Sequence, residues 1–307
     1  MEKAILKTLA YYDIFEFPLK AWEVHKWLIG PPSGRAGKSA SLKQVEKKLK
    51  KLNQESRLSR GSPKAARIMN KGDYFFLTGK KGLVKERVRR EKVSKRHYQT
   101  AKLISLLFKV IPWVKLVGVS GSLAMMGSRE QDDIDIFIVT GKNRIWITRL
   151  FLIILTSLTG IRRKRREKIL SAAGKVCINL ILEEDNLAQR KKNIYLAHEV
   201  LQMHVLWQKE DLYSKFLHDN EWVFRYLPNW RTGVKSQNVK RKTQSYNANL
   251  KSNQIIDWFE GLAKRVQLKI MNGPSGSERI ESGALYFHPE DKGKKILEEY
   301  KSRISKF

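Results

Sequence analysis

Residues 114–140 combine the residue types that bind phosphate and divalent cations. The segment reads VKLVGVSGSLAMMGSREQDDIDIFIVT, in which one apolar run leads to Gly121 and Ser122 and a second contains Asp133 and Asp135. This pattern predicts a strand, a turn into a short helix, and another strand. A Gly-Ser turn at the start of a helix leaves backbone N–H groups available to an anion, and glycine allows a phosphate to approach closely.

Asp133 and Asp135 are spaced for a shared cation site. The side chains of residues i and i+2 of a strand lie on the same face, so both carboxylates are expected to point the same way. Two such carboxylates repel each other unless a cation lies between them, and Mg²⁺ is the ion that carboxylate oxygens favour. One or two Mg²⁺ ions are therefore predicted here. The alternative is that the aspartates pair with nearby arginines such as Arg129 or Arg144.

Together, the two halves of this segment resemble the signature of the DNA polymerase beta-type nucleotidyltransferase superfamily. Ten residues separate Ser122 from Asp133, which gives the pattern G-S-x10-D-x-D between apolar runs. The resemblance covers residues 113–183. It implies that Gly121 and Ser122 hold a nucleoside triphosphate and that Asp133 and Asp135 are catalytic and bind Mg²⁺. The implied reaction transfers a nucleoside monophosphate to a hydroxyl group and releases pyrophosphate.

One position departs from that superfamily. Its members usually carry a third carboxylate on a later strand, which helps to bind the catalytic metal and to deprotonate the attacking hydroxyl. The matching strand here is predicted over 175–182, and Asn179 stands where the acid is expected. Asparagine can offer an oxygen to a metal but cannot take a proton. Asn179 is thus a candidate metal ligand, and the alternative function is a weakly active or inactive nucleotidyltransferase-like regulator that binds nucleic acid.

The first quarter of the chain, 1–82, resembles a winged helix-turn-helix domain. Two helices are predicted within residues 4–28 and a third over 41–54, followed by strands at 57–60 and 74–78. Three helices followed by a basic hairpin is the order of elements in that domain. The resemblance implies that the third helix is the recognition helix.

The third predicted helix has one apolar stripe and a basic outer surface. Leu42, Val45, Leu49 and Leu52 recur at helical spacing, and the lysines fall off that stripe. The functional interpretation is that these lysines bind the phosphates of DNA or RNA, and the alternative is a docking domain whose lysines are merely solvated. The lysines expected to contact nucleic acid are Lys43, Lys47, Lys50 and Lys51.

The remaining elements give the fold class. A basic connecting helix is predicted over 83–111, a nucleotidyltransferase-fold domain over 112–186, and a helical C-terminal region over 187–307. The chain is therefore expected to be α/β (α+β), with a winged-helix domain, a central mixed sheet with helices, and helices at the end. Within the last region, helices are predicted at 191–209, 211–226, 253–271 and 290–305, and a polar loop at 231–252.

The composition limits the class of protein and its partners. The chain has 307 residues, 42% of them hydrophobic, which is enough to form a buried core. It carries 61 Lys and Arg against 30 Asp and Glu, a net charge of +31, which predicts an anionic partner, nucleic acid before an acidic membrane. A single cysteine, Cys177, excludes an internal disulfide framework and favours the reducing cytoplasm. The oligomeric state is not indicated.

The most apolar stretch, 145–161, does not predict a membrane span. Arg149 interrupts it, and the rest, 150–161, has 12 residues where a span needs about 20. A buried helix is predicted instead. The basic run 162–166 beside it leaves docking to a membrane surface as an alternative to a solvated loop.

Overall fold

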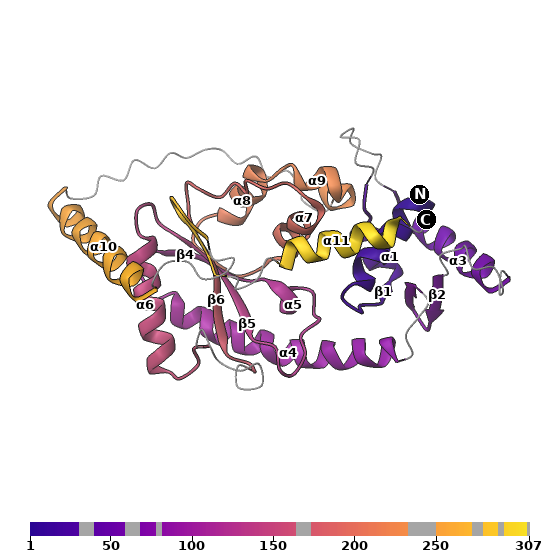
Figure 1. Ribbon diagram of the computed structural model, residues 1–307, viewed down its shortest axis with the longest axis horizontal. Helices are drawn as coiled ribbons and strands as arrows, with labels where there is room; N and C mark the ends of the chain where they lie inside the picture. The colour runs from indigo at the N-terminus through magenta and orange to yellow at the C-terminus, as the bar shows by residue number, and fades with distance from the viewer. Residues whose placement is uncertain are drawn as a thin grey trace.

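The computed structural model describes residues 1–30, 40–58, 68–77, 82–163, 173–232, 250–271, 279–287 and 292–305. Two β-sheets and the helices around them make a mixed α/β fold, as the sequence predicts. The long helix α4 (Leu83–Phe108) runs from the small N-terminal sheet to the large central sheet (Figure 1). None of the helices within the described ranges is both long and apolar enough to cross a membrane.

The N-terminal unit contains three helices and a small antiparallel sheet of order β1-β3-β2. Strands β2 and β3 form a hairpin with a two-residue turn in which Gly72 has φ +58°, a conformation that favours glycine. Apart from the short strand β1, this is the order that the winged-helix resemblance implies, and membership of that class stays a prediction. The elements are α1 (Glu2–Asp13), β1 (Leu19–Lys20), α2 (Ala21–Lys26), α3 (Leu42–Leu58), β2 (Ile68–Lys71) and β3 (Tyr74–Leu77).

The first strand of the predicted hairpin, 57–60, is wrong in its first half, because residues 57–58 belong to helix α3. Helix α3 continues to Leu58, and near its end the Ser56 hydroxyl donates to the Leu52 carbonyl and accepts the Ile68 N–H of β2. The partner of β3 is therefore β2, whose first residue, Ile68, makes this contact. Several residues of the predicted hairpin lie outside the described ranges: Ser59, Arg60, Lys64, Arg67 and Thr78.

The central sheet has six strands in the order β7-β4-β5-β6-β9-β8. Neighbouring strands are antiparallel except β5 and β6, so the sheet is mixed, as predicted. Helix α5 (Gly121–Ala124) lies between β4 and β5, which confirms the strand, turn, helix and strand predicted over 114–140. The strands are β4 (Val114–Val119), β5 (Ile134–Thr140), β6 (Val176–Glu183), β7 (His204–Gln208), β8 (Arg279–Glu281) and β9 (Ala284–Tyr286).

Three of these strands come from the region that the sequence predicts as helical. The helix predicted over 191–209 is wrong in its second half, because α7 (Ile194–Gln202) ends at Met203, whose backbone is extended (φ −52°, ψ 126°). The next residues form β7 and pair with the edge of β4. An unpaired strand edge exposes a row of backbone groups that need hydrogen-bond partners. The spacing of apolar residues along the chain does not show which distant segment supplies them.

The helix predicted over 211–226 is likewise two helices, broken at Asn220. The Asn220 side chain donates to the carbonyls of Leu187 and Phe216 and accepts the Gln189 N–H, so it replaces helical hydrogen bonds with bonds to a neighbouring segment. The predictions at 253–271 and 290–305 are confirmed, and most of the predicted loop 231–252 lies outside the described residues. The helices are α8 (Leu212–Asp219), α9 (Val223–Tyr226), the 3₁₀ helix η2 (Pro228–Thr232), α10 (Leu250–Met271) and α11 (Lys292–Ile304).

Two buried clusters cover the two faces of the central sheet. Ile134, Ile136 and Ile138 of β5 pack with residues of α4 and α6 (Ile145–Leu158). Phe137 and Val139 pack on the opposite face with residues of α7, α8 and the N-terminal α1. Side chains alternate along a strand, so Asp135 belongs to the face of Phe137 and Val139. The domain boundaries proposed from the sequence stay predictions.

Candidate metal and nucleotide site

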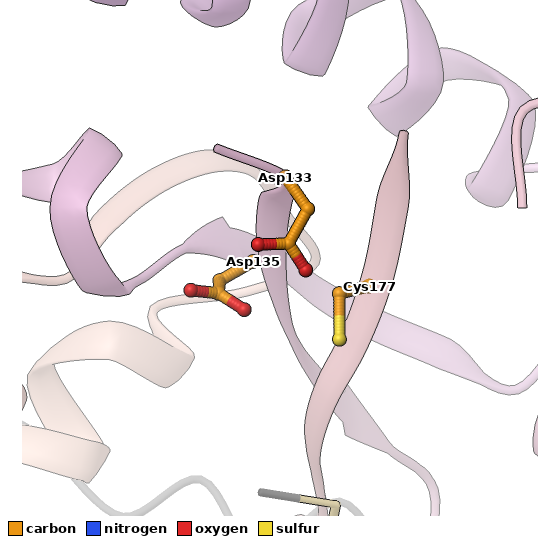
Figure 2. A group of neighbouring side chains, drawn as sticks. All are labelled: Asp133, Asp135 and Cys177. Atoms are coloured by element: carbon orange, nitrogen blue, oxygen red, sulfur yellow. The ribbon is translucent and has the colours of Figure 1, made fainter. Parts of the chain in front are cut away.

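The two predicted catalytic carboxylates lie together at the start of β5. Asp135 is in the strand, and Asp133 precedes its first residue. Figure 2 shows both side chains beside Cys177, which comes from the neighbouring strand β6. One ligand atom from each of the three residues lies within 4.8 Å of the others, and no other such group occurs among the described His, Cys, Asp and Glu residues.

The turn between β4 and α5 lies directly against Asp135. Gly121 has φ +63°, and a Cβ atom placed on it would lie 2.3 Å from Asp135 Oδ2. The Ser120 N–H donates to the Asp135 carbonyl at 3.0 Å, which holds the turn and the strand together. Position 121 therefore requires glycine twice, once for its backbone conformation and once for the space that the carboxylate occupies.

We expect Gly121→Ala to damage this site beyond the cost of its backbone strain. A left-handed conformation costs an alanine about 1–2 kcal/mol, and the new methyl group must also displace the Asp135 carboxylate. Urea unfolding and calorimetric titration with Mg²⁺ measure the two effects separately. Gly160→Ala is the matched control, because Gly160 has φ +70° and nothing within 4 Å of the added Cβ. Equal Mg²⁺ affinities in the two variants would contradict the prediction.

Ser122 holds the loop that connects α5 to β5. Its hydroxyl donates to Asp132 Oδ2 at 2.9 Å, and the Arg129 N–H donates to the same oxygen at 3.0 Å. The Gly127 N–H donates to the Ser122 carbonyl at 2.9 Å. The Ser122 hydroxyl is therefore engaged by the loop, and its predicted role in holding a triphosphate stays a prediction.

Arg163 partly neutralises the acidic site. Its Nη1 lies 2.5 Å from Asp133 Oδ2. The sequence suggests Arg129 and Arg144 as the arginines that pair with the aspartates. This is wrong, because Arg129 pairs with Glu16 and Arg144 with Asp257. Asp135 has no ion pair with any described residue. The arginine therefore balances one of the two carboxylates.

Strand β6 contributes Cys177 to the cluster. In the parallel register of β5 and β6, Asp135 lies opposite Cys177, and the register then shifts. Asn179 is buried, and its Nδ2 donates to Ser120 Oγ at 3.4 Å. Its Oδ1 is also buried and has no hydrogen-bond partner among the described residues. Asn179 as a metal ligand stays a prediction.

Two charged residues far along the chain also act on the site. Burial, Asp133 and Glu199 of α7 raise the pKa of Asp135 to about 8, against the lowering effects of Lys292 of α11 and Arg163. Burial raises the pKa of Glu199 to about 7, and Lys292 opposes this rise. Sequence reasoning misses Glu199 and Lys292 because no motif surrounds them and only the tertiary fold brings them near β5.

We expect the metal-free protein to become less stable as the pH rises through the titration of Asp135. An aspartate in the unfolded chain has a pKa of about 3.9, whereas the pKa of Asp135 in the folded protein is about 8. Between these values the folded state binds more protons than the unfolded state, so the free energy of unfolding falls with rising pH. Urea unfolding across this range should give a flatter profile for Asp135→Asn than for the wild type. Parallel profiles would contradict the assignment.

The donor atoms fit a hard divalent cation. Asp133 and Asp135 offer the carboxylate oxygens that Mg²⁺ favours, and the buried Oδ1 of Asn179 is an acceptor without a partner among the described residues. Burial and the two aspartates raise the pKa of the Cys177 thiol well above its usual range, which keeps it protonated. A protonated thiol is not a ligand that Mg²⁺ selects. The two aspartates are thus the residues that would hold such an ion.

The lysines predicted to bind nucleic acid lie on the outer side of α3. Lys43, Lys47 and Lys50 repeat at i, i+4 and i+7 and are exposed on one face of the helix. Lys51 is also exposed and lies 3.8 Å from Glu55. The opposite stripe is buried as predicted, except that Leu42 is 37% exposed; the buried members are Val45, Leu49 and Leu52. The role of these lysines stays a prediction.

The fold and site together define a mixed α/β protein with a half-buried pair of aspartates against a glycine turn. No protein-family model matches the chain, and no curated protein sequence matches it. Among solved structures the chain is similar to one from the "Crystal structure of the toxin-antitoxin with AMP-PNP". The two are 20% identical with a TM-score of 0.25, over 40% of this chain and 87% of that chain. Similarity at this level carries no argument about function, which must come from the residues of the site.

Proposed function

We propose that the protein is a Mg²⁺-dependent nucleotidyltransferase that moves a nucleoside monophosphate from a nucleoside triphosphate to a hydroxyl group. The observation that carries the proposal is the contact between Gly121 and Asp135, where a Cβ would lie 2.3 Å from the carboxylate. A turn whose backbone conformation and close approach both favour glycine thus lies against one of two neighbouring carboxylates. This is the arrangement that the motif G-S-x10-D-x-D requires.

The chain's own groups have distinct tasks in this reaction. Asp133 and Asp135 would hold Mg²⁺, which when bound neutralises triphosphate charge and makes a hydroxyl more acidic. The backbone N–H groups of Gly121 and Ser122 begin a helix, where such groups have no helical partner and can donate to phosphate oxygens. The hydroxyl oxygen bonds to the α-phosphorus, the bond from that phosphorus to the bridging oxygen breaks, and pyrophosphate leaves with the electron pair. Asn179 cannot take a proton, so the hydroxyl proton passes to water.

The test is pyrophosphate release coupled to a gain of mass on an acceptor. The full chain is incubated with each common nucleoside triphosphate, Mg²⁺ and a DNA or RNA oligonucleotide, and pyrophosphate and the mass of the oligonucleotide are measured with and without EDTA. We expect one pyrophosphate to be released for each nucleotide transferred to the oligonucleotide, and we expect no pyrophosphate in the presence of EDTA. If no pyrophosphate is released from any nucleoside triphosphate, the proposal fails.

A second candidate is a nucleic-acid-binding regulator whose nucleotidyltransferase-like domain binds nucleotide with little turnover. Two observations favour it: Asn179 occupies the position where an acid is expected, and the lysines on one face of α3 are exposed. Binding of a nucleoside triphosphate measured by calorimetry, with no pyrophosphate released in the experiment above, would favour this candidate.

Both candidates predict that Lys47→Glu with Lys50→Glu weakens binding to nucleic acid. Each lysine that contacts a phosphate releases a counterion, so the slope of log affinity against log salt should become shallower by about 0.7 to 0.9 per lost contact. Binding to a labelled duplex over a range of salt concentrations measures this slope. Lys191→Glu with Lys192→Glu makes the same change of charge at two exposed lysines outside α3. If the two double variants lose affinity equally, α3 is not the binding helix.

A further inference from the structure

Helix α10 presents a stripe of large apolar side chains to solvent. Six of its residues are between 39% and 74% exposed, and they recur so that they follow one side of the helix for about 22 Å. Apolar side chains gathered in this way mark a surface that contacts something. The residues, called the α10 stripe below, are Ile255, Trp258, Phe259, Leu262, Val266 and Ile270.

A different side of α10 fastens the helix to the protein. Ala263 is buried, and the Gln267 side chain accepts from Arg149 of α6 and donates to the Trp146 carbonyl. The Glu260 carboxylate accepts the first N–H groups of α6, those of Trp146 and Ile147, both at 2.8 Å. The α10 stripe is therefore held outward on a fixed helix. Figure 1 places α6 and α10 at the end of the molecule opposite the N-terminal unit.

Both acids of α10 in the described range contact the protein, whereas two of its basic residues lie beside the α10 stripe. Glu260 caps α6, and Asp257 pairs with Arg144 at 2.5 Å, so both acids are engaged with the protein. The basic side chains Lys264, Arg265 and Lys269 are exposed and form no ion pair with any described residue. At 100° per residue, Arg265 and Lys269 fall beside Trp258 and Leu262, along one edge of the α10 stripe. The stripe is thus bordered by positive charge that has no ion-pair partner among the residues that the structure describes.

Helix α6 adds apolar surface at the same end of the molecule. It packs against α10 and was predicted to be a buried helix, but it is buried only along one side. Phe151, Ile154 and Leu158 are at least 42% exposed and repeat at i, i+3 and i+7. The basic run 164–166, on which the sequence-based membrane alternative depended, lies outside the described residues.

We propose that the α10 stripe docks the protein on an anionic lipid surface. A convex helix side with aromatic and aliphatic residues and a basic edge fits the boundary between acyl chains and charged headgroups, where the apolar side is buried and the lysines and arginines meet the headgroups. A second copy of this chain suits the stripe poorly, because each copy carries a net charge of +31. The helix lies on the surface and does not cross it.

Sedimentation of the full chain with vesicles tests the proposal without nucleotide, so its outcome is independent of the proposed catalytic activity. The wild type should sediment with phosphatidylcholine vesicles that contain phosphatidylglycerol and only weakly with pure phosphatidylcholine. Leu262→Gln with Val266→Gln leaves the charge unchanged and should lower the partition coefficient at least tenfold. Replacing Arg265 and Lys269 by Gln should lower it by about tenfold or more on the anionic vesicles only, since each basic residue near such a surface contributes about 1 kcal/mol.

The matched control is Trp22→Gln with Leu58→Gln, which removes two exposed apolar side chains from the N-terminal unit and should leave vesicle binding unchanged. Three results would overturn the proposal. If the wild type stays in the supernatant with anionic vesicles, the protein does not dock on them. If the Leu262→Gln, Val266→Gln variant binds as well as the wild type, net charge alone is responsible for the binding. A lipid-free dimer in analytical ultracentrifugation that the same variant dissociates shows that a second copy covers the stripe.

Discussion

Replacing Asp133 and Asp135 together by asparagine is expected to abolish pyrophosphate release, with a loss of at least about 10³-fold. The two carboxylates supply the negative charge that would hold Mg²⁺ beside the Gly121 turn, and asparagine keeps their size while removing that charge. Single-turnover assays with a saturating nucleoside triphosphate measure the rate, and calorimetry measures Mg²⁺ binding. Both should be lost, while circular dichroism stays that of the wild type.

Asp132→Asn is the matched control for this pair. Asp132 adjoins Asp133, but its carboxylate accepts from the Ser122 hydroxyl and the Arg129 N–H instead of joining the cluster with Cys177. Both hydrogen bonds go to the same oxygen, Oδ2, so the side-chain oxygen of asparagine can accept both and Mg²⁺ binding should persist. Turnover that survives in the Asp133, Asp135 double variant, or is lost equally in Asp132→Asn, would remove the site from the reaction.

The motif is readable from the sequence because the elements that form it are consecutive. Gly121 lies in the turn after β4, Asp133 and Asp135 lie at the start of β5, and β4 pairs with β5 directly. Strand alternation and the positive φ required of glycine are local properties, so the spacing alone predicts that the carboxylates share a face. Nothing from outside residues 114–140 is needed to bring these groups together.

Residues from other segments could not be found in the same way. Cys177 enters the cluster because the pairing of β6 with β5 places it opposite Asp135, and this pairing of two distant segments is not written in either strand. Arg163 meets Asp133 from beyond α6, and Glu199 and Lys292 approach Asp135 from α7 and α11. Their spacing in sequence has no periodicity. Only the packing of these elements on the sheet determines their positions.

The same limit explains the errors in the C-terminal region. Strands β7, β8 and β9 are short, and each becomes a strand only because an edge of the central sheet is available to it. Short segments have little intrinsic preference, and a partner from elsewhere in the chain decides their conformation. The long helices α4 and α10, in contrast, carry enough periodicity to be predicted close to their observed bounds.

Arg87→Ala is expected to have the largest effect on stability, lowering the free energy of unfolding by about 3–5 kcal/mol. Arg87 is 4% exposed and joins α4 to the N-terminal unit. Its guanidinium lies 2.8 Å from Glu23 and 2.8 Å from Glu91, and its Cζ is 3.6 Å from the centre of the Phe17 ring. Alanine would leave the buried Glu23 carboxylate without its cation. Urea unfolding measures the change, and the loss should appear in the midpoint of unfolding.

Two further variants separate the buried charge from the lost volume. Arg89→Ala, on the same helix, removes a guanidinium that is 65% exposed and 3.9 Å from Glu86, so it should cost less than about 1 kcal/mol. Glu23→Gln combined with Arg87→Met removes both buried charges and keeps most of the volume, and it should recover stability relative to Arg87→Ala. If the combined variant is no more stable than Arg87→Ala, neither the unpaired Glu23 carboxylate nor the lost volume accounts for the loss of stability. If Arg87→Ala costs no more than Arg89→Ala, the buried pair does not hold α4 to the N-terminal unit.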